Sequence, residues 1–270
     1  MRIVRFVGIN GKNCFGKDLG DGSADVLARN PLEGSLETTG RVVVIGRVLA
    51  PIEPVNVICI GKNYSEHAAE MGGEAPSRPI IFMKPTSALN DPGGAIRLPA
   101  CSHGPEVDYE GELAVVIGTP GRDIPEDKAL DHVLGYTCAN DISARWWQKK
   151  GSGGQWVRGK GFDSFCPLGP VLVTADEIPD PQALTLTTTL NGEEMQRSNT
   201  REMIFGVDHL VSYISQYMTL QPGDIISTGT PFGVGMGLDP QRYLKAGDSI
   251  RLGIDGLGVQ EQQVVPWAPK

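Results

Sequence analysis

The segment Glu106–Gly118, with the sequence EVDYEGELAVVIG, joins a row of acidic residues to an apolar run. The apolar half, LAVVIG, is rich in β-branched residues and too short for an ordinary buried helix, so it is typical of a buried strand. Side chains alternate between the two faces of a strand, so the acidic residues share one face if the strand extends back through them. They are Glu106, Asp108, Glu110 and Glu112.

Carboxylates beside a buried strand lose hydration and repel one another, so they need a proton, a basic partner or a bound cation. We expect Glu106 and Asp108, which lie farther from the apolar run, to form a polar strand end in water. Glu110 and Glu112 lie nearest the run, and we expect them to bind a metal ion. Ligands that are all oxygen favour a hard divalent ion, Mg²⁺ or Mn²⁺ before Zn²⁺.

The composition is that of an ordinary globular protein of 270 residues with a formal net charge of −8. This charge argues against nucleic acid or an anionic membrane surface as the partner. The chain holds no stretch near the ~20 apolar residues that span a bilayer, and Met1–Val7 is typical of a first strand rather than a signal sequence. We therefore expect a soluble, cytoplasmic protein that binds neither nucleic acid nor membrane. The five cysteines form no CxxC pair and are expected to be reduced.

Many short strands and few helices predict an α+β fold that is predominantly β. Residues 1–54 are predicted to form a small N-terminal β-rich domain and linker, with strands at Arg2–Val7 and Arg41–Val48. The linker prediction rests on two prolines, because proline cannot donate to a strand ladder. Residues 55–270 are predicted to form the second, larger domain.

Three local patterns in the larger domain predict specific elements. Asn191-Gly192 follows the alternating run Leu184–Leu190 and is the strongest hairpin signal in the chain. Apolar residues recur at helical spacing from Val207 to Met218 and predict a long helix. A shorter helix is predicted after the strand Asn56–Ile60, with a capping pair of Asn63 and Glu66 at its start and a glycine pair at its end.

The short helix carries His67 and Glu70 at positions i and i+3. At this spacing the carboxylate can orient the imidazole and raise its basicity. The glycines that flank the helix are typical of a mobile lid. The glycine-rich run Gly233–Gly237 lacks the GxGxxG spacing and supports no nucleotide site, whereas Thr228–Pro231 is expected to form a tight loop that offers donors to an anion.

The chain resembles the fumarylacetoacetate hydrolase family through an ordered series of motifs that covers roughly residues 55 to 265. The motifs are GKNYxxHxxE from Gly61, FMKP at 82–85, YExELAVVIG at 109–118, NDISAR at 140–145, KGFD at 160–163 with CPLGP at 166–170, and TGTP at 228–231. The resemblance implies a rolled and layered mixed β-structure and a homodimer. One position departs from the family pattern, because Trp146 stands where an acidic residue commonly follows the arginine.

The resemblance also implies roles for individual residues. Glu110, Glu112 and Asp141 are implied as ligands of Mg²⁺ or Mn²⁺. The implied catalytic residues are His67, Glu70 and Lys160, with the first two as an acid/base pair on a closing lid. The implied substrate contacts are Arg145, Gln148 and Thr230.

The motifs are closest to the branch that holds acylpyruvate hydrolases, oxaloacetate decarboxylases and tautomerases, and hydroxymuconate-type isomerases. We first expect a metal-dependent hydrolase that cleaves a C–C bond in 2,4-dioxo acids, with His67 activating water and Lys160 stabilising a pyruvate enolate. The alternative is decarboxylation of oxaloacetate, or keto–enol tautomerisation or isomerisation of a similar 2-oxo acid. A third hypothesis is a non-catalytic binder of small dicarboxylates.

Overall fold

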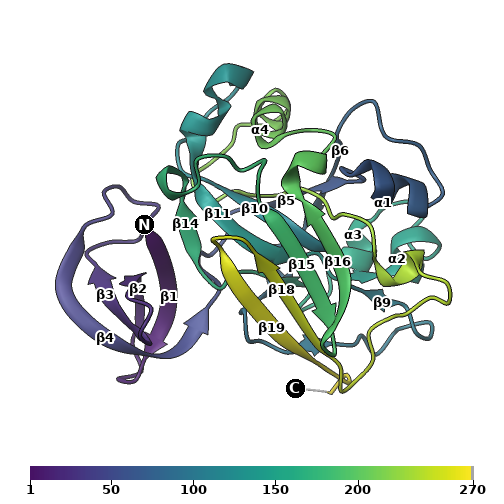
Figure 1. The fold of residues 1–270 in the computed structure, drawn as a ribbon, viewed down its shortest axis with the longest axis horizontal. Helices are drawn as coiled ribbons and strands as arrows, with labels where there is room; N and C mark the ends of the chain where they lie inside the picture. The colour runs from purple at the N-terminus through teal and green to yellow at the C-terminus, as the bar shows by residue number, and fades with distance from the viewer. Residues whose placement is uncertain (269–270) are drawn as a thin grey trace.

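The computed structural model describes residues 1–268, and within them a mixed sheet of ten strands forms the centre of the molecule (Figure 1). Its strands follow the order β2-β3-β4-β1-β14-β11-β10-β17-β5-β6. In chain order they are β1 (Arg2–Gly8), β2 (Asn13–Asp18), β3 (Ser23–Leu27), β4 (Thr38–Leu49), β5 (Val57–Gly61), β6 (Ile80–Lys84), β10 (Gly111–Ile117), β11 (Val133–Asn140), β14 (Leu172–Thr174) and β17 (Ile225–Ser227).

A second sheet has five strands in the order β16-β15-β18-β19-β8. These are β8 (Ile96–Arg97), β15 (Thr185–Leu190), β16 (Glu193–Asn199), β18 (Ser249–Ile254) and β19 (Gly258–Val265). Two small ladders pair β9 (Val107–Asp108) with β12 (Ser143–Ala144), and β7 (Leu89–Asn90) with β13 (Cys166–Pro167).

The helices are short, which confirms a fold that is mostly β. They are α1 (Ser65–Glu70), α2 (Arg145–Lys149), α3 (Val157–Lys160) and α4 (Val207–Ser215). Short 3₁₀ segments occur at Thr86–Ala88, Glu126–His132, Ala175–Glu177, Thr200–Glu202 and Gly235–Gly237. Within residues 1–268 no helix has the length and apolar character needed to cross a membrane.

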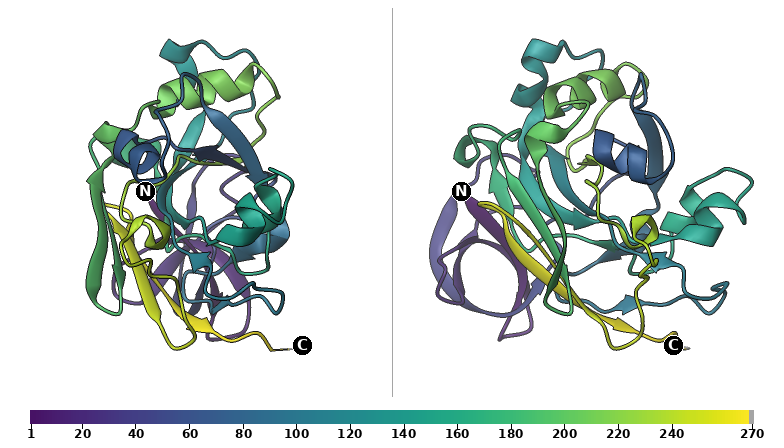
Figure 2. Two further views of the ribbon diagram at one scale, coloured as in Figure 1. Left: turned by 90° about the vertical axis from the view of Figure 1, so that its right-hand side faces the viewer. Right: turned by 45° about the vertical axis from the view of Figure 1, so that its right-hand side comes forward.

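The first four strands pair antiparallel in a closed ring, because β1 contacts both β2 and β4 while β3 joins those two (Figure 2). The ring is continuous with the large sheet, since β1 also pairs with β14. Ile3 of β1 is fully buried against Val116 and Leu172 of the larger part. Residues 1–54 thus share a sheet and part of a core with the rest, and the boundary at residue 54 stays a prediction.

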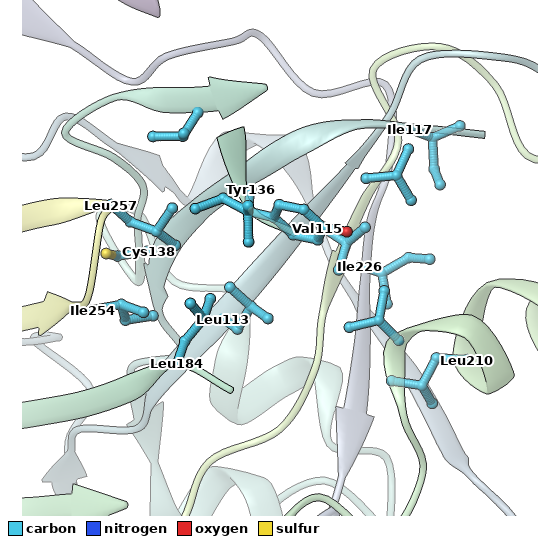
Figure 3. Packing of buried hydrophobic residues seen from close by; sticks show 14 of the residues in the cluster. Leu113, Val115, Ile117, Tyr136, Cys138, Leu184, Leu210, Ile226, Ile254 and Leu257 are labelled. Carbon is cyan, nitrogen blue, oxygen red and sulfur yellow. The ribbon is translucent and has the colours of Figure 1, made fainter. Parts of the chain in front are cut away.

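Strand β10 runs through the centre of the core, as the apolar run predicts. Leu113, Val115 and Ile117 face one cluster, in which they meet residues of β11, β17 and α4 (Figure 3). Ala114 and Val116 face a different cluster on the opposite side. Because both faces are covered, the strand is apolar at every position after Glu112.

Two further local predictions are confirmed. Asn191 and Gly192 connect β15 and β16 and have φ angles of 53° and 84°, which is the left-handed geometry that a tight hairpin turn of this type requires. Helix α4 presents Leu210, Val211 and Ile214 to the core. The helix ends at Ser215, so Met218 packs against the core from the turn that follows.

The predicted capping pair at the start of the short helix is wrong. Helix α1 begins at Ser65, and its N-cap residue Tyr64 makes no side-chain cap. Asn63 is fully buried, and its Nδ2 donates to the carbonyls of Thr228 (2.8 Å) and Phe205 (3.0 Å). A fully buried amide needs partners in the interior, and these tertiary partners replace the local cap.

We expect Ile117→Ala, in the buried part of β10, to lower the free energy of unfolding by about 2–5 kcal/mol, because the side chain is fully buried and its loss leaves a cavity. The matched control is Val42→Ala in β4, where the side chain is 57% exposed, with an expected change within about 0.5 kcal/mol. Denaturant unfolding monitored by circular dichroism measures both. Similar losses for the two variants would contradict the central place of β10.

Candidate active site

The acidic row does not lie on one straight strand. Strand β9 ends at Asp108 and β10 begins at Gly111, so the chain turns at the two residues between them. The turn is held by Glu110, whose N–H donates to the side chain of Asn140 (3.0 Å) and whose carbonyl accepts from the N–H of Asp141 (2.8 Å). Glu110 is thereby placed next to the end of β11.

The expectation that Glu106 and Asp108 lie in water is wrong, because the two residues are 5% and 0% exposed. The carboxylate of Glu106 accepts from the N–H groups of His103 and Trp146, both at 2.7 Å. The carboxylate of Asp108 accepts from Gly235 N (2.7 Å) and Met236 N (3.0 Å). His103 lies just before Glu106 in the chain, whereas Trp146 of α2 and the segment Gly235–Met236 are distant in the sequence and fold over the acidic row.

Glu110, Glu112 and Asp141 form a buried acidic triad. One carboxylate oxygen from each residue lies within 4.8 Å of the others. The antiparallel register of β10 and β11 produces this proximity, because Gly111 pairs with Asn140 and the acidic residues flank that pair. The structure therefore brings together the three residues that the sequence analysis implied as metal ligands.

Three buried cations contact two members of the triad. Lys160 Nζ donates to Glu110 Oε2 (2.7 Å), Asp141 Oδ2 (2.5 Å) and Ser143 Oγ (2.8 Å), which occupies all three of its hydrogens. Lys84 Nζ donates to the other oxygen of Asp141 (2.5 Å).

Arg145 is the third of these cations, and it connects the triad to the rest of the acidic row. Its Nη1 donates to Glu110 Oε1 at 2.5 Å, and its Nη2 lies 2.7 Å from Asp108 Oδ2. Trp146, the position that departs from the family pattern, stacks on His103 with ring centroids 3.5 Å apart. The orientation of Arg145 is thus set by carboxylates other than the residue that follows it.

The electrostatics differ sharply between the two glutamates. Burial alone raises the pKa of Glu110, but Lys160 and Arg145 outweigh it and hold the pKa below its ordinary value. Burial raises the pKa of Glu112 well above its ordinary value, and the charges of Asp141 and Glu110 raise it further. Glu112 accepts hydrogen bonds from Ser227 Oγ (2.5 Å) and Gly229 N (3.0 Å), and within residues 1–268 it has no salt bridge.

These observations fit a divalent cation at the triad. When all are ionised, Asp108, Glu110, Glu112 and Asp141 carry four negative charges, and Lys84, Arg145 and Lys160 carry three positive ones. The charge without a partner is that of Glu112, which is only 1% exposed. A buried carboxylate in this position needs a proton or a cation, and a set of carboxylate oxygens suits Mg²⁺ or Mn²⁺.

His67 and Glu70 contact each other on α1. The distance from His67 Nδ1 to Glu70 Oε1 is 2.7 Å, and Gly233 N donates to the second carboxylate oxygen at 3.0 Å. A Cβ at Gly237 would lie 2.4 Å from that same oxygen. The glycine-rich run that supports no nucleotide site thus allows the backbone to approach Glu70 closely.

One pocket brings most of the predicted residues together. Its lining includes His67, Glu110, Arg145, Gln148 and Lys160, and its remaining walls are Gly61, Lys62, Met71, Phe82, Lys149 and Trp156. Residues of α1, α2 and α3 contribute to its lining, and in Figure 1 these helices lie on the opposite side of the molecule from the N-terminal ring.

Thr230 lies outside the described lining of this pocket. Its Oγ1 donates to the carbonyl of Gly111 (2.9 Å) and accepts from Gln196 Nε2 (2.8 Å). The loop that it belongs to does bind an anion, as expected, but the anion is the carboxylate of Glu112, which accepts from Gly229 N. A substrate contact at Thr230 stays a prediction.

The sequence analysis assigned no role to Lys84, Lys62 or Lys149. Lys84 ends strand β6 and is 2% exposed, and the signal for it was a lysine at the end of an apolar strand within the FMKP motif. Lys62 lies within the GKNY motif. Lys149 is the first of two lysines that end the segment 145–150, RWWQKK, and a local pattern cannot assign it to a pocket.

Comparison with known proteins identifies the family. The family model described as the C-terminal domain of fumarylacetoacetate hydrolase matches residues 56–265. The mitochondrial oxaloacetate tautomerase fahd2 of Xenopus laevis is 50% identical over 219 residues, which is 81% of this chain and 68% of that protein.

Solved structures agree over the whole chain. The 2-hydroxyhepta-2,4-diene-1,7-dioate isomerase from Mycobacterium marinum is 41% identical with a TM-score of 0.85, and the match covers 100% of both chains. The 5-carboxymethyl-2-hydroxymuconate delta-isomerase from Mycobacterium smegmatis is also 41% identical, with a TM-score of 0.86 over 99% of this chain and 100% of that one. This chain belongs to the fumarylacetoacetate hydrolase family.

Proposed function

We propose that this enzyme catalyses a proton shift in a 2-oxo acid, as a keto–enol tautomerase or a closely similar isomerase. The observation that carries the proposal is the contact between His67 and Glu70, which faces the pocket that also holds Glu110 and Lys160. The relatives named as a tautomerase and as isomerases support this alternative over the C–C hydrolysis that the sequence analysis placed first.

His67 is the proposed base. Because an ionised carboxylate can only accept, the proposed tautomer carries its hydrogen on Nδ1, toward Glu70, and its lone pair on Nε2. In the keto-to-enol direction Nε2 accepts a proton from the carbon next to the keto group and a proton is delivered to the keto oxygen; in the enol-to-keto direction the enol oxygen loses its proton and the carbon gains one from Nε2. Glu70 is itself held by the N–H of Gly233, so the orientation of the imidazole is fixed before the substrate binds.

Lys160 and Arg145 are proposed to stabilise the negative charge that develops on the substrate. Burial alone lowers the pKa of Lys160, but Asp141 and Glu110 outweigh it and raise the pKa above its ordinary value. Lys160 therefore stays cationic and cannot serve as the base. Fixed positive charge on buried side chains stabilises an oxyanion more strongly than the same charge in water would.

Glu110, Glu112 and Asp141 are the residues that would hold Mg²⁺ or Mn²⁺. When bound, the ion supplies a Lewis acid that lowers the energy of the negatively charged form of the substrate. Gln148 is proposed as a substrate contact, because it lines the pocket and its Oε1 accepts from Arg145 (3.0 Å).

The same residues could support hydrolysis of a 2,4-dioxo acid, with His67 activating a water molecule, or decarboxylation of oxaloacetate.

We expect the purified protein to accelerate loss of enol absorbance from oxaloacetate without releasing pyruvate. Ultraviolet spectroscopy follows the enol, and a coupled lactate dehydrogenase assay follows pyruvate. Release of pyruvate in step with enol loss would show decarboxylation instead, and rapid release from an acylpyruvate would show hydrolysis.

We expect His67→Ala to lower the rate of enol conversion by about 10²-fold or more, because it removes the base, and to leave metal binding unchanged. The control is His209→Ala, which removes an imidazole on α4. That imidazole is partly exposed and pairs with Glu126. The rate of that variant should equal that of the wild type. A His67→Ala variant with full activity would eliminate this histidine as the base.

Mg²⁺ should raise the unfolding temperature of the wild type, because a ligand that binds only the folded state stabilises it by about 2.7 kcal/mol at a hundred times its Kd. Glu112→Gln should lose this increase and Glu106→Gln should keep it, since Glu106 is equally buried but bonded to backbone N–H groups. Thermal unfolding with Mg²⁺ and with a chelator measures both effects. An undiminished increase in Glu112→Gln would place the ion elsewhere.

A further inference from the structure

Two lysines in the wall of the active-site pocket have no anionic partner. Lys62 and Lys149 both line it, and neither forms a salt bridge or a hydrogen bond through its ammonium group with any residue in 1–268. The buried cations Lys84, Arg145 and Lys160 differ, because each contacts at least one carboxylate. The positive charges in the interior of the pocket are therefore paired with carboxylates, whereas those of Lys62 and Lys149 in its wall are not.

The two lysines reach this wall from separate elements. Lys62 directly follows β5 with a φ angle of 55°, a left-handed conformation that a residue with a side chain rarely adopts. Its Nζ lies next to Gly73, where a Cβ would be 2.7 Å from it. Lys149 is the last residue of α2, one turn after Arg145.

Their charges also act on each other. Burial, and then the positive charges of Arg145 and Lys62, lower the pKa of Lys149, while the negative charge of Glu110 acts in the opposite direction. Unpaired cations that converge on one pocket repel, and an anion that enters between them relieves the repulsion. The strained backbone at Lys62 adds a cost that an interaction with a ligand can offset.

The other walls restrict where such an anion can lie. Phe82 and Trp156 form an apolar wall, with ring centroids 5.3 Å apart. The ring of Trp156 covers Gly61, where a Cβ would be 2.4 Å from a ring carbon. His67, Glu110 and Lys160 form the reacting end, so a second charged group on the substrate has Lys62 and Lys149 as its available partners.

We propose that Lys62 and Lys149 bind the second carboxylate of a 2-oxo dicarboxylic acid, an inference that rests on the function proposed above. They act as specificity-determining residues. They select a dicarboxylate over a monocarboxylic 2-oxo acid of the same length, and they take no part in the proton shift.

Binding of two ligands of matched size tests this inference. Oxaloacetate and 2-oxobutanoate both have four carbons, and they differ in whether a carboxylate or a methyl group ends the chain. Calorimetry with the Mg²⁺-loaded protein measures the Kd of each ligand for the wild type, Lys62→Met and Lys149→Met. The control is Lys150→Met, which removes a neighbouring cation that is exposed, as Lys149 is, but lies outside the described pocket lining.

We expect the wild type to bind oxaloacetate more tightly than 2-oxobutanoate. Lys62→Met and Lys149→Met should each weaken oxaloacetate about tenfold, the scale of one lost charge-assisted hydrogen bond, and leave 2-oxobutanoate within about twofold. Lys150→Met should change neither. Equal weakening of both ligands, or unchanged binding of oxaloacetate, would overturn the inference.

Turnover of oxaloacetate is measured on the same samples, so the two proposals can fail separately. If the wild type binds oxaloacetate through these lysines without accelerating enol conversion, the carboxylate site stands and the tautomerase proposal fails. If turnover is rapid but the lysine variants match the wild type in Kd and KM, the tautomerase proposal stands and the carboxylate site fails.

Discussion

The compensation of buried charge is the constraint on which this structure depends. Several carboxylates lie beside the central strand β10, where water cannot solvate them. Burying an ion pair costs several kcal/mol per ion in desolvation, and removing one partner typically destabilises a protein by about 3–5 kcal/mol. Lys84 illustrates the constraint, because it is buried, lies outside the described pocket lining, and donates to Asp141 and the carbonyl of Ile142.

The topology of the sheet determines where the charges meet. Glu110 and Asp141 are 31 positions apart, yet the antiparallel register of β10 and β11 places them beside the same pair of residues. Strand β17 pairs with the other edge of β10 and brings Ser227 to Glu112. The core strands therefore place the acidic triad rigidly, whereas α1 brings His67 and Glu70 to it from a short helix between loops.

Patterns that depend on neighbours in the sequence were predicted well. The apolar run of β10, the Asn191-Gly192 hairpin and the apolar face of α4 each form through local geometry and burial. The acidic triad was implied by the family motifs, and the antiparallel register of β10 and β11 explains why its three residues lie close together. Strands β2 and β3 were not predicted, because glycine, asparagine and aspartate are frequent there and the strands depend on the ring that they close.

Features that depend on distant partners could not be predicted from local sequence. Asp108 was expected in water because it lies farther from the apolar run, but it is buried and accepts from the backbone N–H groups of Gly235 and Met236. Asn63 has the residue type of a helix cap, yet its partners lie more than 140 positions away. In both cases a polar side chain is satisfied by a loop whose approach no local pattern specifies.

The pairing of buried charges also separates the side chains that keep a fixed charge from those that can exchange a proton. Glu110 is held in its charged form, and Lys160 and Arg145 are held in theirs, because each stabilises the charge of the other. Groups locked in one state can hold or stabilise charge, but they cannot exchange a proton with a substrate near neutral pH. Histidine is the side chain suited to that exchange, and His67 lies in the same pocket with its tautomer set by Glu70. With Glu110, Lys160 and Arg145 held in their charged forms, His67 is the pocket residue best suited to the proton transfer proposed above.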